Sequence, residues 1–427
     1  MESKYEDGSL TRRLISDEAQ DNGLKHQDSE SGSENHSTEG TASSFKTILN
    51  GFNALSGVGI LSTPYALASG GWLSLIFFFI IAIVGYYSGV LIQRCMEKDQ
   101  SILTFSDIGG RAFGNKGRIW INIIMCLELY LVATGFLIVE GDNLHNLFPK
   151  VNIEVAGLSF GGTQSFILIS ALIILPTIWL DDLSILSYIS ATGVVASFVI
   201  LGSIFWVGAF DGVGFHEKGE LIKWSGMPTA VSLYSFCYCA HPVFPTIYTS
   251  MKKKHQFSYV LVICFILCTF TYAATAIFGY LMFGPDVQSQ ITLDLPTSKI
   301  SSKIAIYTTL INPLAKYALM VKPILDAAKT RFQYKKPLSM VTSTILLVTS
   351  VMVALCLPFF GDLMSLVGAF LSLTGSIIIP CLCYLKISGT YKRLTCELVV
   401  VGGIIGIAVM VVILGTYTAV LQILGHF

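Results

Sequence analysis

Charged side chains are scarce in this sequence of 427 residues. Asp, Glu, Lys and Arg make up 13% of it and hydrophobic residues 53%, whereas about a quarter of a soluble domain is charged. The few charges are separated by apolar runs of about twenty residues or more, long enough to cross about 30 Å of hydrocarbon. This scarcity excludes a water-soluble domain and indicates an integral, multi-pass membrane protein.

The first 43 residues lack what a folded segment or a signal peptide needs. They are rich in Ser, Asp and Glu and nearly free of aromatic side chains, so we expect a disordered tail over 1–43. A basic start followed by an apolar stretch and a small-residue cleavage site is also missing. We therefore expect this tail to stay in the cytosol.

Residues for catalysis or metal binding are missing inside the apolar segments. The ten cysteines all fall within or at the ends of such segments, and Cys237-x-Cys239 and Cys381-x-Cys383 are too isolated to supply the four ligands of a zinc site. His241 is the only histidine well inside a span, and no paired aspartates occur at mid-depth. We therefore expect neither an enzyme nor a metal or cofactor site.

Eleven apolar segments follow the tail. The segment 104–114, TFSDIGGRAFG, is amphipathic and too polar to span, and we expect it to lie along the membrane surface. The expected spans are 44–68, 71–94, 118–141, 163–180, 184–210, 227–251, 257–283, 303–327, 338–359, 362–385 and 396–423.

Lys and Arg are distributed unequally between alternate loops. If the N-terminus is cytosolic, the cytosolic loops hold about fifteen of them and the opposite side about five, as the positive-inside rule requires. We therefore predict a cytosolic N-terminus and, since the number of spans is odd, a C-terminus on the other side.

Two spans carry residues that interrupt helices. The first contains NALSGVGILSTPYAL (53–67), and the sixth contains AHPVFP (240–245); Gly and Pro both open a membrane helix. Five crossings separate the two spans, so a five-span repeat has inverted topology, as in secondary transporters. The alternative is a pair of Pro-kinked structural helices whose small residues allow close packing.

These interruptions predict a substrate site at mid-depth, since unwound backbone is tolerated there only beside a protein-enclosed cavity. Freed amides at the start of a half-helix can hold an anionic group. The expected substrate-binding residues are Ser56, Gly57, Val58, Gly59 and Ile60 in the first span and Tyr238, Cys239 and Ala240 in the sixth.

Several segments resemble the amino acid/auxin permease family, and they are most similar to its plant vacuolar amino acid transporters, relatives of the vesicular inhibitory amino acid transporter. The resemblance covers the chain from about residue 43 onward. One motif departs from it, since that branch usually has Gly-His-Ala where this chain has Ala240-His241-Pro242. The matching segments are NALSGVGILSTPYALASGGW (53–72), CAHPVFPTIYTSM (239–251), FGYLMFG (278–284), SQITLDLP (289–296) and INPLAKYAL (311–319).

The resemblance implies an all-α LeuT-type fold, a five-plus-five inverted repeat with an eleventh transmembrane helix. It places the repeats at 44–210 and 211–385, and the last helix with a short luminal end at 386–427. It also implies a monomer that moves neutral amino acids by alternating access, linked to protons as symport or antiport, in the vacuolar membrane or another endomembrane. An amino acid sensor with the same pocket and a sodium-coupled permease remain alternatives.

Ionisable residues inside spans usually face the bundle interior. Glu128 and Lys316 lie at similar depth from opposite sides, so an ion pair between them is possible, either as a static pair or as a proton-coupling pair. His241 could carry the coupling proton or bond to freed carbonyls. Glu140 and Lys322 lie nearer the edges and are expected to reach the interface.

A polar position in the first span completes the expected coupling set. Asn53 matches a polar position in the first span of related permeases, and it is expected to tie that span to Thr308, Thr309 or Asn312 in the eighth. In sodium-coupled relatives such a cluster holds an ion. No carboxylate is expected nearby, so we expect no tight metal site here.

The topology can be tested directly. A tag inserted at Ser33 is expected on the cytosolic side and a tag after Phe427 on the luminal or extracellular side, because the positive charges alternate between loops. Protease protection of each tag in sealed vesicles measures its side. Two tags on the same side would mean that the number of spans is even.

Overall fold

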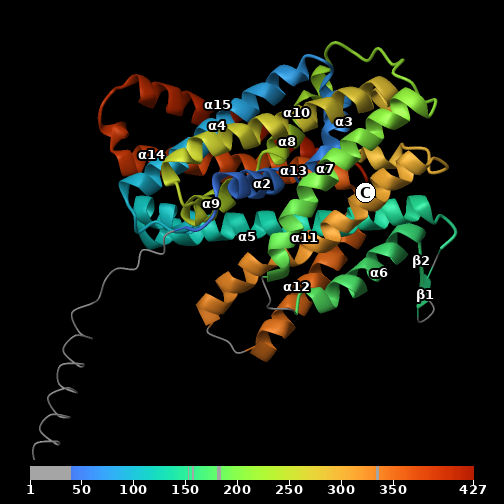
Figure 1. Ribbon diagram of the computed structural model, residues 1–427, viewed down its shortest axis with the longest axis horizontal. Coiled ribbons are helices and arrows are strands. Elements are labelled where there is room, and N and C mark those ends of the chain that lie inside the picture. The colour runs from blue at the N-terminus through green and yellow to red at the C-terminus, as the bar shows by residue number, and fades with distance from the viewer. Residues whose placement is uncertain (1–39, 152, 156–157, 180–183, 333–335) are drawn as a thin grey trace, which may run out of the picture. The chain divides into compact units, whose positions relative to one another are not determined.

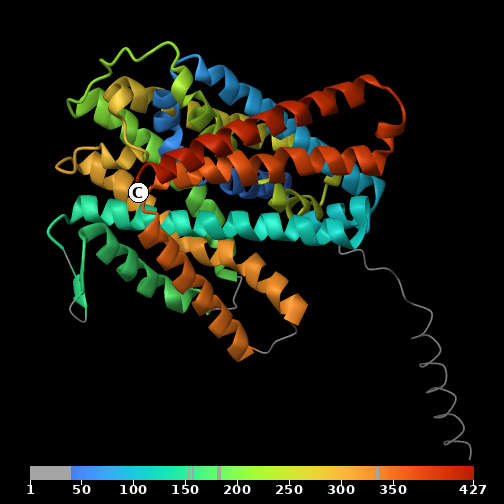
Figure 2. The same ribbon diagram turned by 180° about the vertical axis from the view of Figure 1, so that it is seen from behind.

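Most of the expected spans are continuous helices, and two are interrupted in the middle. The computed structural model describes residues 40–151, 153–155, 158–179, 184–332 and 336–427. Residues 41–427 form one compact unit (Figures 1 and 2). The expected tail over 1–43 lies almost entirely outside the described residues.

Eight described helical segments are long and apolar enough to cross a membrane. A ninth, α6 (Gly162–Thr177), is apolar but shorter. These nine correspond to nine of the eleven expected spans, and they confirm a multi-pass membrane protein. The continuous helices are α4 (Ser74–Lys98), α5 (Phe105–Leu147), α7 (Ser184–Phe210), α10 (Phe257–Phe283), α11 (Ile300–Phe332), α12 (Lys336–Cys356) and α15 (Cys396–Leu424).

The first expected span is two half-helices, α2 (Ser44–Leu55) and α3 (Gly59–Gly70). At Ser56 the backbone leaves the helical region, with φ −80° and ψ 84°. Within α3, Pro64 removes the donor that the Ile60 carbonyl would have received, and the Thr63 hydroxyl donates to that carbonyl at 3.0 Å instead. The motif Ser-Thr-Pro therefore replaces a lost backbone bond with a local side chain.

The sixth expected span is also broken, into α8 (Met227–Cys237), the 3₁₀ turn η2 (His241–Val243) and α9 (Phe244–Ser250). Tyr238 ends α8, and the prolines in the turn and at the start of α9 prevent the helix from continuing across the gap. Both interruptions predicted from the sequence are present at the predicted residues.

The two broken spans lie in one group of helices. Helix α10 packs against α2, α3 and α4, while α5 packs against α6, α11 and α12. In both views α5, α6, α11 and α12 lie together on one side, with α2, α4, α8 and α10 on the other (Figures 1 and 2). Helix α7 contacts both α2 and α11.

The amphipathic segment 104–114 forms the start of α5 and joins the third span at a bend. Gly114 has φ 71° inside the helix, a conformation that favours glycine. Thr104 caps this start and receives a hydrogen bond from the Asp107 amide. Hydrogen bonds from Ser101 and from the Arg111 guanidinium, 2.5 Å away, hold the pKa of Asp99 below its ordinary value.

Two features have no counterpart in the sequence prediction. A short antiparallel hairpin, β1 (Ile153–Val155) and β2 (Leu158–Phe160), precedes α6. The tenth span is not uniform: α13 (Phe360–Leu366) and α14 (Ile379–Ser388) are joined through the π-helical segments η6 (Val367–Ser372) and η7 (Thr374–Ile378). Such wide turns occur often at functional sites.

Candidate functional site

Lys316 joins the eighth span to the first break. Its side chain is buried, and its ammonium nitrogen donates to the carbonyl oxygens of Asn53 at 3.3 Å and Ser56 at 3.1 Å. Asn53 lies in the last turn of α2 and Ser56 directly follows its end, where carbonyls are left without intrahelical donors. A cation at a helix C-terminus is favoured by the helix dipole, so Lys316 completes the end of α2.

Helix α7 packs closely against the C-terminal end of α2, where Lys316 binds. The Ser197 hydroxyl is hydrogen-bonded to the Ser56 hydroxyl. A Cβ atom at Gly193 would collide with Asn53 Oδ1 and would lie 3.5 Å from Lys316 Nζ. We call these five residues the first-break node: Asn53, Ser56, Gly193, Ser197 and Lys316.

Tyr272 of α10 holds the first break from another side. Its hydroxyl donates to the Leu55 carbonyl at 2.8 Å and accepts from the Gly57 amide at 3.2 Å. The Gly57 amide also donates to the Leu55 carbonyl at 3.0 Å, so one buried phenol adds a second donor and a second acceptor to the backbone pair that closes the break. The unwound residues are held by fixed side chains on α7, α10 and α11.

Glu128 of α5 lies at the second break. It is 4% exposed, and its Oε1 accepts a hydrogen bond from the Ser372 hydroxyl at 2.7 Å. The Cys239 thiol is within hydrogen-bond range of the same carboxylate, and a Cβ at Gly375 would lie 3.4 Å from Glu128 Oε2. The π-helical segments of the tenth span thus surround this carboxylate. We call Glu128, Cys239 and Ser372 the second-break cluster.

The ion pair that the sequence made possible between Glu128 and Lys316 is not formed. Among the described residues no ion pair joins them, and each side chain has other partners. Equal depth in the membrane does not fix the direction in which a side chain leaves its helix, which explains the error. Lys316 contacts the first break, and Glu128 lies at the second.

His241 has other partners than the first-break node and the second-break cluster. It is fully buried, and its Nε2 lies 2.7 Å from the Ser88 hydroxyl and 2.9 Å from the Gly85 carbonyl, both on α4. The Ser88 hydroxyl also donates to the Ser376 carbonyl in η7 at 2.5 Å. His241 thus ties the second break to the second and tenth spans.

The expected link from Asn53 to the eighth span has a different form. No hydrogen bond from Asn53 to Thr308, Thr309 or Asn312 occurs among the described residues, and buried Thr309 Oγ1 has no partner there. The link instead runs from the Asn53 carbonyl to Lys316. Residues Thr308 and Asn312 lie half-buried on α11, two turns and one turn before Lys316, respectively.

The Glu140 side chain does not reach the surface as expected, since this residue is 1% exposed although it lies near the end of α5. Neither of its carboxylate oxygens has a hydrogen-bond partner among the described residues. Its side chain is too short to pass the helices that pack on α5. Lys322, with a longer side chain, is half-buried.

The residues expected to bind substrate differ in their surroundings. A Cβ at Gly57 would meet no atom within 4 Å, so this position borders open space, whereas a Cβ at Gly59 would lie 3.3 Å from Cys237 Cα. Gly59 is thus needed for close packing of α3 on α8. Val58, Ile60 and Ala240 are buried apolar residues.

Tyr238 directs its ring away from the break. The ring stacks on Phe265 with centroids 5.7 Å apart, and its hydroxyl is hydrogen-bonded to Thr269 at 2.8 Å. Both partners belong to α10, so only the backbone of Tyr238 is available at the second break.

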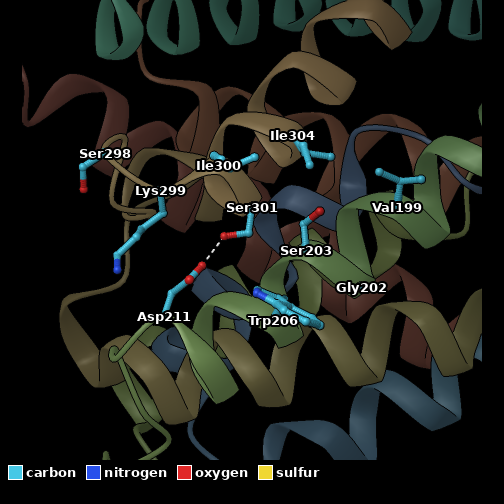
Figure 3. A pocket seen from close by; sticks show the side chains of 10 residues that line it. All are labelled: Val199, Gly202, Ser203, Trp206, Asp211, Ser298, Lys299, Ile300, Ser301 and Ile304. Atoms are coloured by element: carbon cyan, nitrogen blue, oxygen red, sulfur yellow. Dashed lines mark hydrogen bonds between the residues drawn. The ribbon is translucent and has the colours of Figure 1, made fainter.

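A separate cavity of about 680 Å³ lies between α7 and the start of α11 (Figure 3). It includes none of the expected site residues. Trp206 and Ile304 are 53% and 46% exposed, so the cavity opens at the outer surface of the helices. The Ser301 hydroxyl bonds to Asp211 at its edge. Its lining residues are Val199, Gly202, Ser203, Trp206, Asp211, Ser298, Lys299, Ile300, Ser301 and Ile304.

Sequence reasoning did not identify Gly193, Ser197, Tyr272 or Ser372. Each is a small or aromatic residue inside an ordinary apolar helix, and no local pattern distinguishes it. Only the distant partner gives it a role: Ser372 is 244 positions from Glu128, and Tyr272 is 217 positions from Leu55.

The first-break node can be tested with two glycines on α7. Gly193→Ala is expected to lower stability by about 1–3 kcal/mol, because the added methyl group overpacks the contact with Asn53. Gly202→Ala is the matched control, since a Cβ there meets no atom within 4 Å. Thermal unfolding of the detergent-solubilised protein measures both. Equal melting temperatures for the two variants would contradict the packing described for Gly193.

Comparison with known proteins identifies the family. Residues 40–421 match the model of a family described as transmembrane amino acid transporter protein. Amino acid transporter AVT1J of Arabidopsis thaliana is 60% identical over 408 residues, covering 94% of this chain and 96% of the relative. Amino acid transporter AVT1I of the same organism is 57% identical over 390 residues, covering 90% and 96%. Both relatives are transporters by name.

Solved structures show the fold. MhsT in complex with L-phenylalanine superposes with a TM-score of 0.58 at 14% identity, covering 89% of this chain and 99% of MhsT. A Na⁺-coupled sialic acid symporter gives 0.53 at 13% identity, covering 90% of each chain. The fold is therefore the LeuT type, with α15 as the eleventh helix. The chain belongs to the transmembrane amino acid transporter family.

Proposed function

We propose that the protein is a secondary active transporter that moves neutral amino acids by alternating access and couples this movement to protons. The observation that carries the proposal is the arrangement at the first break. A buried ammonium group completes the end of α2, and beside it α3 begins with a glycine. Membership of the amino acid transporter family supports the substrate class.

The substrate carboxylate is proposed to bind at the start of α3. The first amides of a helix have no intrahelical acceptor and carry the positive end of the dipole. Gly57 borders open space at this point, which leaves room for the two oxygens. The amide of Gly57 is already used by Tyr272, and the amide of Ile60 donates to the Gly57 carbonyl at 3.4 Å, so the amides of Val58 and Gly59 are the proposed donors.

The substrate ammonium group is proposed to bind near Glu128 in the second-break cluster. This carboxylate is buried, and its partners Ser372 and Cys239 are neutral. An amino acid with an uncharged side chain offers one positive and one negative group, which matches one carboxylate at the second break and one helix start at the first. This match supports neutral amino acids over cationic or anionic ones.

Lys316 is proposed as the coupling residue. Its ammonium occupies the place where carbonyl oxygens of the first break could otherwise coordinate a free cation. A sodium ion needs several oxygen ligands, and a tethered ammonium group already uses the two carbonyls. Loss of its proton would remove the charge that these carbonyls hold and would loosen α2 from α11. This supports proton coupling over the sodium-coupled alternative.

His241 is proposed to have a structural role, since its bonds to α4 lie apart from both charged groups. The organelle is proposed to be the vacuole or another endomembrane, with a cytosolic N-terminus. The repeats are proposed to run over 44–210 and 211–385. A monomer is proposed as the working unit.

The transport activity is tested by uptake of labelled neutral amino acids into proteoliposomes with an imposed pH difference. We expect accumulation above the outside concentration. Gly57→Leu is expected to abolish uptake, because its side chain fills the space beside the first break. Gly403→Leu is the matched control, since Gly403 also has no atom within 4 Å of an added Cβ but lies exposed on α15. Substrate binding without accumulation would favour the sensor alternative.

The coupling role is tested by Lys316→Met, with Lys322→Met on the same helix as the control. The Lys316 variant is expected to lose at least about 90% of uptake driven by the pH difference, since the titrating group is gone. It is expected to keep exchange of internal for external substrate. The Lys322 variant should keep both activities. Retained pH-driven accumulation in a folded Lys316 variant would assign the proton to another group.

A further inference from the structure

A cluster of cations lies where the tenth and eleventh spans connect. Lys98 ends α4, Lys386 lies in the last turn of α14, and Lys392 and Arg393 lie in the loop before α15. All four side chains are exposed. We call these four residues the basic patch. They sit at the ends of helices that are long enough to cross a membrane, so the patch lies at the level of the lipid headgroups.

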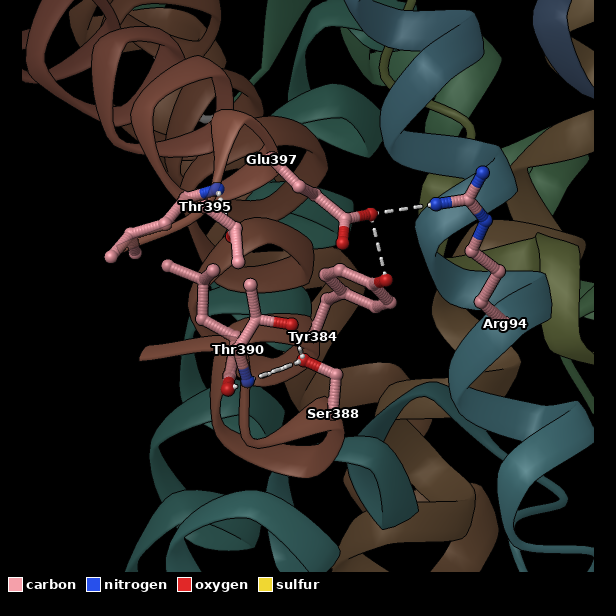
Figure 4. A network of polar contacts seen from close by, with 8 residues as sticks. Arg94, Tyr384, Ser388, Thr390, Thr395 and Glu397 are labelled. Atoms are coloured by element: carbon pink, nitrogen blue, oxygen red, sulfur yellow. Dashed lines mark hydrogen bonds and ion pairs between the residues drawn. The ribbon is translucent and has the colours of Figure 1, made fainter. Parts of the chain in front are cut away.

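The loop that carries the basic patch is held in a fixed form. Gly389 ends α14 with φ 78°, which allows the chain to reverse sharply. The Ser388 hydroxyl is hydrogen-bonded to the Thr390 hydroxyl at 2.7 Å and accepts from the Thr390 amide (Figure 4). The Lys98 ammonium donates to the Ser388 carbonyl at 3.0 Å, which joins the second span to this loop.

The patch is concentrated around one aromatic ring. The Lys386 ammonium lies 5.1 Å from the centre of the Tyr391 ring, and the Lys392 ammonium lies 6.0 Å from it. Both cations are therefore held on the same side chain, and Arg393 follows directly in the chain. Their mutual repulsion is not relieved by protein, because among the described residues none of the four cations forms an ion pair.

The neighbouring charges are already neutralised. Arg94 of α4 pairs with Glu397 of α15 at 2.8 Å, and the same carboxylate oxygen accepts from the Tyr384 hydroxyl at 2.8 Å (Figure 4). The carboxylate of Glu397 is thus used to join the second, tenth and eleventh spans, and Asp99, next to Lys98, pairs with Arg111. The cations of the basic patch are left for a partner outside the chain.

An exposed apolar residue beside the basic patch indicates what kind of partner the patch binds. Leu394 is 91% exposed and follows Arg393 directly, while Tyr391 is 46% exposed. A leucine at the headgroup level can enter the acyl boundary while the adjacent cations stay in the interface. We infer that the basic patch and Leu394 bind an anionic phospholipid whose headgroup carries additional phosphate groups, that is, a phosphorylated phosphatidylinositol.

A headgroup with several phosphate charges suits this patch of four cations better than a headgroup with a single charge. Clusters of four or more Lys and Arg directly beside a transmembrane helix bind polyphosphorylated lipids, whereas isolated cations only attract the anionic surface. A soluble inositol phosphate presents the same phosphates without acyl chains. Leu394 distinguishes the two sources, since only the lipid places hydrocarbon beside it.

The test uses the full chain purified in neutral detergent. Dioctanoyl phosphatidylinositol bisphosphate, dioctanoyl phosphatidylcholine and free inositol trisphosphate are titrated, and the dissociation constant is measured by intrinsic fluorescence. We expect the inositol lipid to bind at least about tenfold more tightly than either of the others, because it offers both multiple charges and acyl chains.

Two matched variants decide whether the patch is the site. The triple variant Lys386→Gln, Lys392→Gln, Arg393→Gln is expected to weaken lipid binding at least about tenfold. The control Lys252→Gln, Lys253→Gln, Lys254→Gln removes three exposed cations from another loop and should leave binding within about twofold. Equal losses in both would indicate general surface charge and overturn the proposal. Equal melting temperatures for the two variants show that both are folded.

The variant Leu394→Ser tests whether the acyl chains contribute to binding or only the phosphates of the headgroup. This change is expected to weaken binding of the inositol lipid and to leave inositol trisphosphate binding unchanged. Leu221→Ser is the control, since Leu221 is also strongly exposed, at 66%, but lies in a different loop. Binding of inositol trisphosphate as tightly as the lipid, with no effect of Leu394→Ser, would make this a site for a soluble inositol phosphate and overturn the proposal.

Discussion

The contact between the Lys316 ammonium and the last carbonyls of α2 is the interaction on which the centre of the protein depends. A helix that stops inside a membrane leaves carbonyl oxygens with no water to solvate them, and each costs several kcal/mol if it stays unpaired. Lys316 supplies donors to two of them. Its own burial is tolerable because those dipoles face it. The break and the buried lysine therefore require one another.

Close packing around this contact follows from the same need. Three helices must approach within hydrogen-bond reach of one short stretch of backbone. Gly193 allows α7 to come near because any side chain there would meet Asn53, and Tyr272 reaches across from α10 because a phenol can donate and accept at once. The absence of a side chain at Gly193 and the long side chain of Tyr272 thus bring α7 and α10 into contact with the same break. Movement of α2 would have to change all of these contacts together, which makes the first break a suitable two-state element.

The sequence predicted the spans and the two breaks because these depend on local composition. Long apolar runs, and the Gly and Pro residues near Gly57 and Pro242, can be interpreted from a few neighbouring positions in the sequence. The partners of the buried charges could not be predicted in the same way. Depth along a helix can be counted from the sequence, but the direction of a side chain around the helix axis depends on which helix packs there. Glu128 and Lys316 have similar depth and face different breaks, so the pair that their depth allowed is not formed among the described residues.

The irregular tenth span explains where Glu128 finds its partner. A π-helical turn holds an extra residue, which shifts the following side chains around the helix relative to a regular α-helix. Ser372 lies at the end of the first such segment and Gly375 within the second, and both approach Glu128. Ser376 turns its carbonyl to Ser88, which in turn contacts His241. One distorted span therefore reaches both the carboxylate and the histidine beside the second break. The π-helical turns cannot be recognised from the hydropathy of VGAFLSLTGSII (367–378), which looks like that of a regular helix. In the structure this segment contacts Glu128 directly and His241 through Ser88.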